Sequence, residues 1–259
     1  LMATFEAQVE GLTSLSIDGS SSPTQTELTQ FLTDGAKEVL TALPVTKKIL
    51  YSTSSALDNS TTNLTLGGSE VLGVMRDDGT INQPCRRIPS TMSGRSQDSA
   101  EMTFGTASDP VWWVVNNILS IFPEPSSSGA TVQTLAYPAV AFGDSAITKF
   151  PDEAEYLVPI YGAIKTLQNK MASMMDEIPR NSDQDGTFTT ASSSSQGYEK
   201  VRHLLENSED IELASSIIGS LSSEMQQFMA EYKWYQEQQA KLQADYDKGL
   251  QIVMAGYWH

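Results

Sequence analysis

Basic side chains are scarce in this 259-residue chain, which has 16 Lys and Arg against 32 Asp and Glu and a formal net charge of −16. Proteins that grip nucleic acid neutralise its phosphates with Lys and Arg, so this composition argues against a DNA- or RNA-gripping surface. An acidic wall past which DNA slides without sticking is still consistent with it, because like charges repel.

Cysteine, histidine and long apolar runs are also scarce. Cys85 is the only cysteine, so neither an internal disulfide nor a thiolate metal cluster can form within the chain. The two histidines, His203 and His259, lie far apart in sequence and suggest neither a metal-ligand pair nor a nucleophile with its base. No apolar run reaches the ~18 residues of a membrane-spanning helix, and the N-terminus lacks the basic-then-apolar order of a signal peptide. We expect a soluble protein without a cofactor or a visible export signal.

Recognisable catalytic motifs are missing as well. There is no glycine-rich phosphate loop followed by a helix, no nucleophile elbow and no zinc-protease helix, so we expect no enzymatic activity. One local basic cluster could hold a phosphate or an acidic partner, although salt-bridged strand residues are its ordinary explanation. Its members are Arg76, Arg86, Arg87 and Arg95.

The strongest positive pattern is a helical seam near the C-terminus. Apolar residues recur there in alternating steps of three and four, which is the period of a coiled coil, with only Gln239 and Gly249 off-type. This predicts one helix from about Asp210 to Met254, ~65 Å long at ~1.5 Å per residue. The seam consists of Ile211, Ala214, Ile218, Leu221, Met225, Phe228, Tyr232, Tyr235, Leu242, Tyr246 and Val253.

A helix cannot bury its own apolar stripe, so this one needs a partner. Either another part of the chain or a neighbouring copy covers it, and the sequence leaves both open. Eight seam residues are therefore our candidate interface: Ile218, Leu221, Met225, Phe228, Tyr232, Tyr235, Leu242 and Tyr246.

The N-terminal half of the chain predicts helices followed by strands. Residues 1–44 predict two helices, the second opening at a capping box of Thr24 and Glu27 and ending before Pro44. Residues 45–142 change to short segments rich in Val, Ile, Thr and Tyr separated by turn residues, which predicts an inserted antiparallel β unit of six to eight strands.

Two dipeptides inside the β unit predict two-residue hairpin turns. Asp78-Gly79 separates a strand beginning at Glu70 from a second strand over residues 81–88, and Asn116-Asn117 separates two further apolar runs. Trp112 and Trp113 are adjacent in one of those runs and must point to opposite sides of a strand. We expect one in the core and the other at an interface, with a sugar-binding face as the alternative.

The rest of the chain predicts a return to helix. Residues 143–178 form a returning helix that completes the helical core, with a kink at Pro159 because proline lacks an amide donor. Residues 179–197 are a flexible Ser-rich linker, and residues 198–259 are a C-terminal helical arm. The predicted fold class is α+β, in which N-terminal and central helices pack together around an inserted antiparallel β unit and a long coiled-coil-like helix follows.

Two stretches resemble structural proteins of tailed bacteriophages, marine and cyanobacterial ones in particular. One comprises residues 2–9 (Met-Ala-Thr-Phe-Glu-Ala-Gln-Val) and 23–39. The other comprises Ala136-Tyr137-Pro138 and residues 147–163, and it resembles the strand and Pro-acidic helix of head-to-tail adaptor proteins. The order of helices, β insertion and returning helix also resembles that family over about residues 2–175.

This resemblance implies a noncatalytic virion protein that forms a ring, commonly of twelve copies, beneath the portal vertex. Such a ring extends the DNA channel, contacts the portal protein and the next tail or neck protein, and lets DNA pass without specific binding. The resemblance further implies assembly in the host cytoplasm, a final location at the head–tail junction, and no membrane partner. The alternatives are another neck or tail component such as a tail terminator, a carbohydrate-binding or adhesin module using Trp112 or Trp113, and an enzyme with an unrecognised site.

Overall fold

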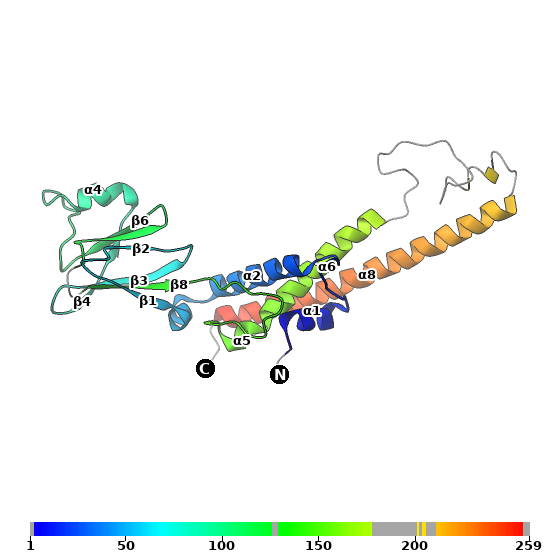
Figure 1. Cartoon of the computed structure of the whole chain (residues 1–259), viewed down its shortest axis with the longest axis horizontal. Coiled ribbons are helices and arrows are strands. Elements are labelled where there is room, and N and C mark those ends of the chain that lie inside the picture. The colour runs from blue at the N-terminus through cyan, green and yellow to red at the C-terminus, as the bar shows by residue number, and fades with distance from the viewer. Residues whose placement is uncertain (1–2, 126–128, 178–200, 202–203, 206–210, 256–259) are drawn as a thin grey trace. The chain divides into compact units, whose positions relative to one another are not determined.

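The computed structural model describes residues 3–125, 129–177, 201, 204–205 and 211–255 (Figure 1). Contacts within the chain divide it into two compact units. The first comprises Leu1–Phe31 and Pro159–Asp247, and the second comprises Leu32–Val158 and Lys248–His259. Helices and two β-sheets are both present, so the predicted α+β class is confirmed.

Two helices open the chain, α1 (Phe5–Thr13) and α2 (Gln25–Ala42). The predicted capping box is confirmed: the Thr24 amide donates to Glu27 Oε2 at 2.7 Å, and the Glu27 amide donates to Thr24 Oγ1 at 3.3 Å. These two bonds satisfy amides that the helix itself cannot pair. The apolar face of α2 is buried through Leu28, Leu32, Ala36, Val39 and Leu40.

The second unit contains two four-stranded sheets. One has the order β1 (Thr53–Leu57), β8 (Ala130–Leu135), β3 (Glu70–Asp77), β4 (Asn82–Pro84), and the other has the order β2 (Asn63–Thr65), β7 (Ile118–Phe122), β6 (Val111–Val115), β5 (Arg86–Arg87). The short helices α3 (Val45–Lys48) with η1 (Ile49–Tyr51), and α4 (Ser93–Ser96) with η2 (Ser90–Met92), flank these strands in the sequence. Eight strands lie in the described residues, as expected.

The two predicted hairpins are confirmed, but one turn is longer than expected. Asn116 and Asn117 form the two-residue turn between β6 and β7, with positive φ angles of 49° and 64°. In the other hairpin Asp77 pairs with Asn82, which leaves a four-residue loop in place of a two-residue turn. The carboxylate of Asp78 explains the longer loop, because its Oδ1 accepts from the amides of residues 80 and 81 at 2.9 and 3.0 Å.

The single strand expected over residues 81–88 is wrong, because the chain changes sheets at Cys85. β4 belongs to one sheet and β5 to the other. The Cys85 amide still donates to the Val74 carbonyl of the first sheet at 2.8 Å, and the next amide, that of Arg86, donates to the Pro110 carbonyl beside the second sheet at 2.8 Å. β5 then pairs with β6 in parallel, a departure from the expected antiparallel unit that the long connection over residues 88–110 permits.

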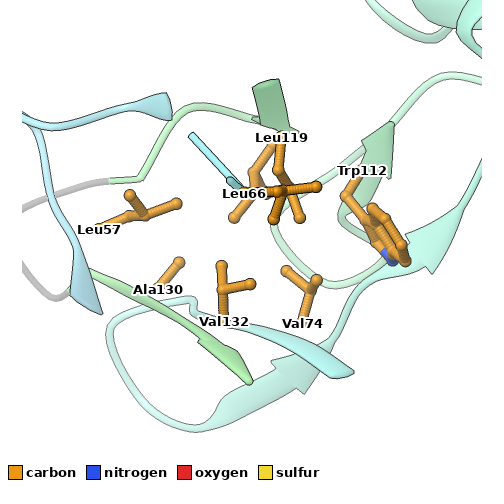
Figure 2. Close-up of a cluster of buried hydrophobic side chains, with 8 residues drawn as sticks. Leu57, Leu66, Val74, Trp112, Leu119, Ala130 and Val132 are labelled. Atoms are coloured by element: carbon orange, nitrogen blue, oxygen red, sulfur yellow. The ribbon is translucent and has the colours of Figure 1, made fainter. Parts of the chain in front are cut away.

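The apolar core of this unit lies between the two sheets (Figure 2). Side chains from the β1–β8–β3–β4 sheet and from the other sheet point toward each other there, as the inner faces of a β-sandwich do. Trp112 is in this core, whereas Trp113 is only half-buried. The expectation that one tryptophan of the pair lies in the core is therefore confirmed by Trp112. The core residues are Leu57, Leu66, Val74, Trp112, Leu119, Ile121, Ala130 and Val132.

The returning helix is divided into α5 (Asp152–Glu155) and α6 (Leu157–Glu177). The kink expected at Pro159 is therefore a break three residues earlier, at Tyr156. Pro159 has no amide to donate to the carbonyl of Glu155, and its ring crowds that carbonyl, so the turn before proline opens.

The long C-terminal helix is confirmed as α8 (Ile211–Ala255). The predicted linker over residues 179–197 lies outside the described residues, as do His203 and His259. Among the helices that the structure describes, none has the length and hydropathy that a bilayer crossing requires.

Candidate interface on the C-terminal helix

The seam of α8 follows a strict seven-residue repeat from end to end. Written as a heptad, position a holds Ile211, Ile218, Met225, Tyr232, Gln239, Tyr246 and Val253, and position d holds Ala214, Leu221, Phe228, Tyr235, Leu242 and Gly249. All eight candidate interface residues therefore share one face of one helix.

The C-terminal part of this face is covered by the chain itself. Tyr246 is 2% exposed and Val253 is 0% exposed, and Tyr235 and Leu242 are also buried. The ring of Tyr246 lies 5.7 Å from that of Tyr161 in α6, centroid to centroid, in a tilted arrangement. Three candidate residues, at 235, 242 and 246, are thus core residues of this chain.

Gly249 interrupts the apolar seam because the side chains of Leu157 and Tyr156 lie too close to its Cα for any residue with a Cβ atom. A Cβ atom placed on Gly249 would lie 2.5 Å from Leu157 Cδ2 and 2.6 Å from the Tyr156 hydroxyl oxygen. Leu157 is fully buried at the start of α6. The off-type residue in the sequence pattern therefore marks a close approach of two helices.

These contacts show that α6 and α8 run antiparallel. Leu157 of α6 lies against Gly249 of α8, and Tyr161 of α6 lies against Tyr246 of α8. Residue numbers therefore increase along α6 while those of the contacting residues in α8 decrease. α6 ends at Glu177, 16 residues after Tyr161 (177 − 161 = 16), which comes opposite about residue 230 of α8 (246 − 16 = 230). Figure 1 shows α8 extending beyond the end of α6.

The N-terminal part of the seam is less well covered. Ile218 is 45% exposed, and Leu221, Met225, Phe228 and Tyr232 are only half-buried. Residues 218–232 are called the open stretch below. On its N-terminal side the seam is covered again, because Ala214 is buried in a small cluster with Val201 and Leu204.

A hollow of about 530 Å³ lies beside the open stretch. It is lined by Phe228, Met229, Ala230, Tyr232, Lys233 and Gln236. Met229 is 64% exposed and was not among the predicted interface residues. Its signal in the sequence was an apolar residue at position e, directly beside the seam.

The four arginines of the basic cluster do not converge on one site. Arg76 is buried and donates from Nε to the Pro123 carbonyl at 3.0 Å, and Arg86 pairs with Asp109 at 3.0 Å. The guanidinium carbon of Arg87 lies 5.4 Å from the centroid of the Trp112 ring. Arg86 thus forms a salt bridge, as the ordinary explanation expects, whereas Arg76 bonds a backbone carbonyl and Arg87 lies over an aromatic ring. Arg95 lies apart in α4.

Trp113 lines a second, smaller hollow of about 220 Å³ on the outer side of its sheet. In the register of β2, β7 and β6, Asn63 stands opposite Ser120 and Ser120 opposite Trp113, so these three form a row across the sheet. The Ser120 hydroxyl donates to Asn63 Oδ1 at 2.6 Å. The hollow is also lined by Thr62, Gln97, Ile121, Phe122 and Glu124.

The described residues contain no group of three or more His, Cys, Asp or Glu side chains placed to hold a metal ion. Cys85 is half-buried beside the sandwich core, and burial raises the pKa of its thiol to about 12. At neutral pH that thiol is protonated and a poor nucleophile.

No protein-family model matches this chain, and no curated protein matches it. Its function is therefore argued from its own surfaces, among which the open stretch of α8 is the main candidate.

Proposed function

We propose that this protein is a noncatalytic structural component of a tailed-phage virion, an adaptor ring subunit that joins the portal to the tail. The open stretch is the surface through which α8 contacts another protein of that assembly. The viral setting is motivated by the resemblance of residues 2–9 and 23–39 to structural proteins of tailed phages, and of residues 136–138 and 147–163 to head-to-tail adaptor proteins.

The observation that carries the assembly role is the unequal burial of one continuous seam. The same heptad pattern runs through Tyr246, which is buried against α6, and through Ile218, which is 45% exposed. A helix that needed only intrachain cover would have polar residues where that cover ends. Apolar residues at 221, 225 and 228 instead favour a second contact, made on assembly.

The charge of the chain agrees with a protein that surrounds passing DNA. Ring subunits associate head to tail through two different surfaces, and the channel they enclose must not hold the DNA. A formal net charge of −16 supplies repulsion in place of phosphate binding.

The experiment is cryo-electron microscopy of the protein mixed with the portal protein of the same phage, and of intact virions. A twelve-fold ring beneath the portal is the expected result. Six-fold rings farther down the tail would instead indicate a tail component such as a terminator. Isolated subunits, with no matching density in the virion, would refute a structural role in the particle.

A variant pair ties that assembly to the open stretch. Leu221→Gln with Phe228→Gln removes two d-position side chains, and we expect it to abolish the ring while leaving the buried seam intact. Ser216→Gln with Ser223→Gln introduces the same residue at two exposed f positions of α8 and should assemble normally. Equal assembly of both variants would show that the open stretch is not the contact.

A second candidate function, carbohydrate binding, is favoured by the Trp113 hollow. A half-exposed indole offers an apolar face to a sugar ring, and Asn63, Gln97 and Glu124 supply hydrogen-bonding groups around it. Glycan-array binding that is lost in Trp113→Ala and kept in Val115→Ala, an exposed position at the end of the same strand, would support this function. Absence of binding by the unaltered protein would refute it.

A further inference from the structure

We infer that the hollow at Trp113 selects an uncharged sugar ring and rejects an acidic one, because the carboxylate of Glu124 lines it without an ionic partner. This inference rests on the carbohydrate-binding candidate above and names its class of ligand. It does not depend on the virion role. Its support comes from the charges, the available hydrogen-bonding groups and the size of the hollow.

The indole of Trp113 gives the hollow an apolar platform. Its side chain is only half-buried on the outer side of the sheet, and no described residue accepts a hydrogen bond from its ring nitrogen. The C–H groups on one face of a sugar ring can pack on such a surface. This contact alone does not separate neutral from acidic sugars, so any selectivity comes from the polar residues around it.

The polar side chains next to Trp113 are held in place by bonds to one another. The Ser120 hydroxyl donates to Asn63 Oδ1 at 2.6 Å, and Asn63 Nδ2 donates to Thr62 Oγ1 at 3.3 Å. The Ser120 oxygen keeps a lone pair with which it can accept from a ligand hydroxyl. A ligand therefore meets a row of polar groups that is already ordered.

Glu124 is the charged group of the hollow. Among the lining residues that the structure describes, no other is charged, and no described residue forms an ion pair with its carboxylate. The nearby cation, Arg76, donates from Nε to the Pro123 carbonyl at 3.0 Å and from Nη2 to the Glu124 carbonyl at 3.1 Å. Arg76 thus bonds the backbone of residue 124 and leaves the carboxylate available to a ligand.

An ionised carboxylate suits a neutral sugar and opposes an acidic one. It only accepts hydrogen bonds, sugar hydroxyls donate them, and bonds to a charged group are stronger than those between neutral groups. A sugar carboxylate would instead bring a second negative charge. Two like charges ~4 Å apart in water repel enough to weaken binding about fivefold, and the formal net charge of −16 adds to this repulsion.

The size of the hollow favours one sugar ring. Its volume of about 220 Å³ lies below the ~300–1,000 Å³ of sites for drug-sized ligands. Gln97 closes one side: it directly follows α4, which lies beside β2 and β6 (Figure 1). No described residue bonds the Gln97 side-chain amide, so it offers both a donor and an acceptor to the remaining hydroxyls of the ring.

Paired ligands that differ in one group test the selectivity. The full-length chain is first applied to an array of neutral and acidic glycans. The methyl glycoside of the best-bound neutral hexose is then compared with its uronate counterpart, which has a carboxylate in place of the CH₂OH group. In nuclear magnetic resonance titrations followed by the indole N–H signals, we expect the neutral glycoside to bind about fivefold more tightly at low ionic strength. Added salt should narrow this difference.

Three variants assign the selectivity to Glu124. Glu124→Gln keeps the shape of the side chain and removes its charge, so the two affinities should become equal. Glu153→Gln removes the same charge at an exposed position of α5 outside the hollow, and it should leave the difference unchanged. Trp113→Ala should lose binding of both ligands.

The possible failures are distinguishable. Equal affinity of the unaltered chain for both ligands, or a difference that survives in Glu124→Gln, would overturn this inference and leave carbohydrate binding in place. An array without any bound glycan would refute the carbohydrate-binding candidate itself, and this inference with it.

Discussion

Replacing Gly219 of α8 by alanine should stabilise the protein, whereas replacing Gly249 of the same helix by alanine should give no gain or a loss of stability. Gly219 and Gly249 lie in the same helix, but a Cβ atom at Gly219 would meet nothing within 4 Å. At Gly249 it would lie 2.5 Å from Leu157 Cδ2 and 2.6 Å from the Tyr156 hydroxyl oxygen. The two substitutions therefore add the same atoms to one helix in different surroundings.

The magnitudes follow from two opposing terms. Alanine in a helix interior is favoured over glycine by ~1 kcal/mol, and both variants gain this. Overpacking a filled site costs ~1–3 kcal/mol. Tyr156 is 44% exposed and can swing away, but Leu157 is fully buried and cannot. We expect Gly219→Ala to stabilise by up to ~1 kcal/mol, and Gly249→Ala to be ~1–3 kcal/mol less stable than Gly219→Ala.

Urea unfolding followed by far-ultraviolet circular dichroism measures both variants against the unaltered chain. Because the gain in helix propensity is common to both, the difference between the two variants reports the steric cost alone. Each kcal/mol corresponds to a shift of roughly 2–4 °C in melting temperature for a chain of about this size. If Gly249→Ala is as stable as Gly219→Ala, then α6 does not approach α8 at this point and the explanation of the interrupted seam is wrong.

Three other predictions concern single side chains. Native Cys85 should react with a thiol reagent at pH 8 ~10³-fold more slowly than in the unfolded chain, because burial raises its pKa to about 12; equal rates would contradict its protected position. Glu70→Gln should cost ~1–3 kcal/mol in urea unfolding, because it removes the carboxylate 2.8 Å from the buried Lys48 ammonium, whereas Asp109→Asn, which breaks an exposed pair, should cost under ~1 kcal/mol. Hydrogen bonds from Thr24, first from its amide and then from its side chain, lower the pKa of Glu27. The ionised form of Glu27 therefore stabilises the fold above its ordinary pKa, and this contribution disappears as the pH falls through the lowered pKa. Because Glu27→Gln lacks that contribution, it should lose less stability than the unaltered chain between about pH 5 and 3.

Local features of this protein were readable from the sequence because neighbouring residues decide them. The capping box of Thr24 and Glu27 needs only two side chains three residues apart, and Asn116-Asn117 forms its turn because asparagine tolerates a positive φ. The extent of α8 likewise followed from a repeat within one segment. The α+β class resulted from the order of such segments.

The missed change of sheet depends on residues distant in the sequence. The chain leaves one sheet at Cys85 because the Pro110 segment offers the next carbonyl, and nothing between residues 81 and 88 reveals that partner. The longer loop at Asp78 is a local feature that was also missed: the Asp-Gly pair suggested a two-residue turn, but the Asp78 carboxylate accepts from the amides of residues 80 and 81.

The candidate interface shows the same division most clearly. Its period, its eight residues and its need for a partner were all contained in the order of the amino acids along α8. Only the tertiary structure decided which part of the seam has cover within the chain, since that depends on where α6 begins, at Leu157, and where it ends, at Glu177. Periodicity reports which residues share a face, but burial depends on what the rest of the chain brings to that face.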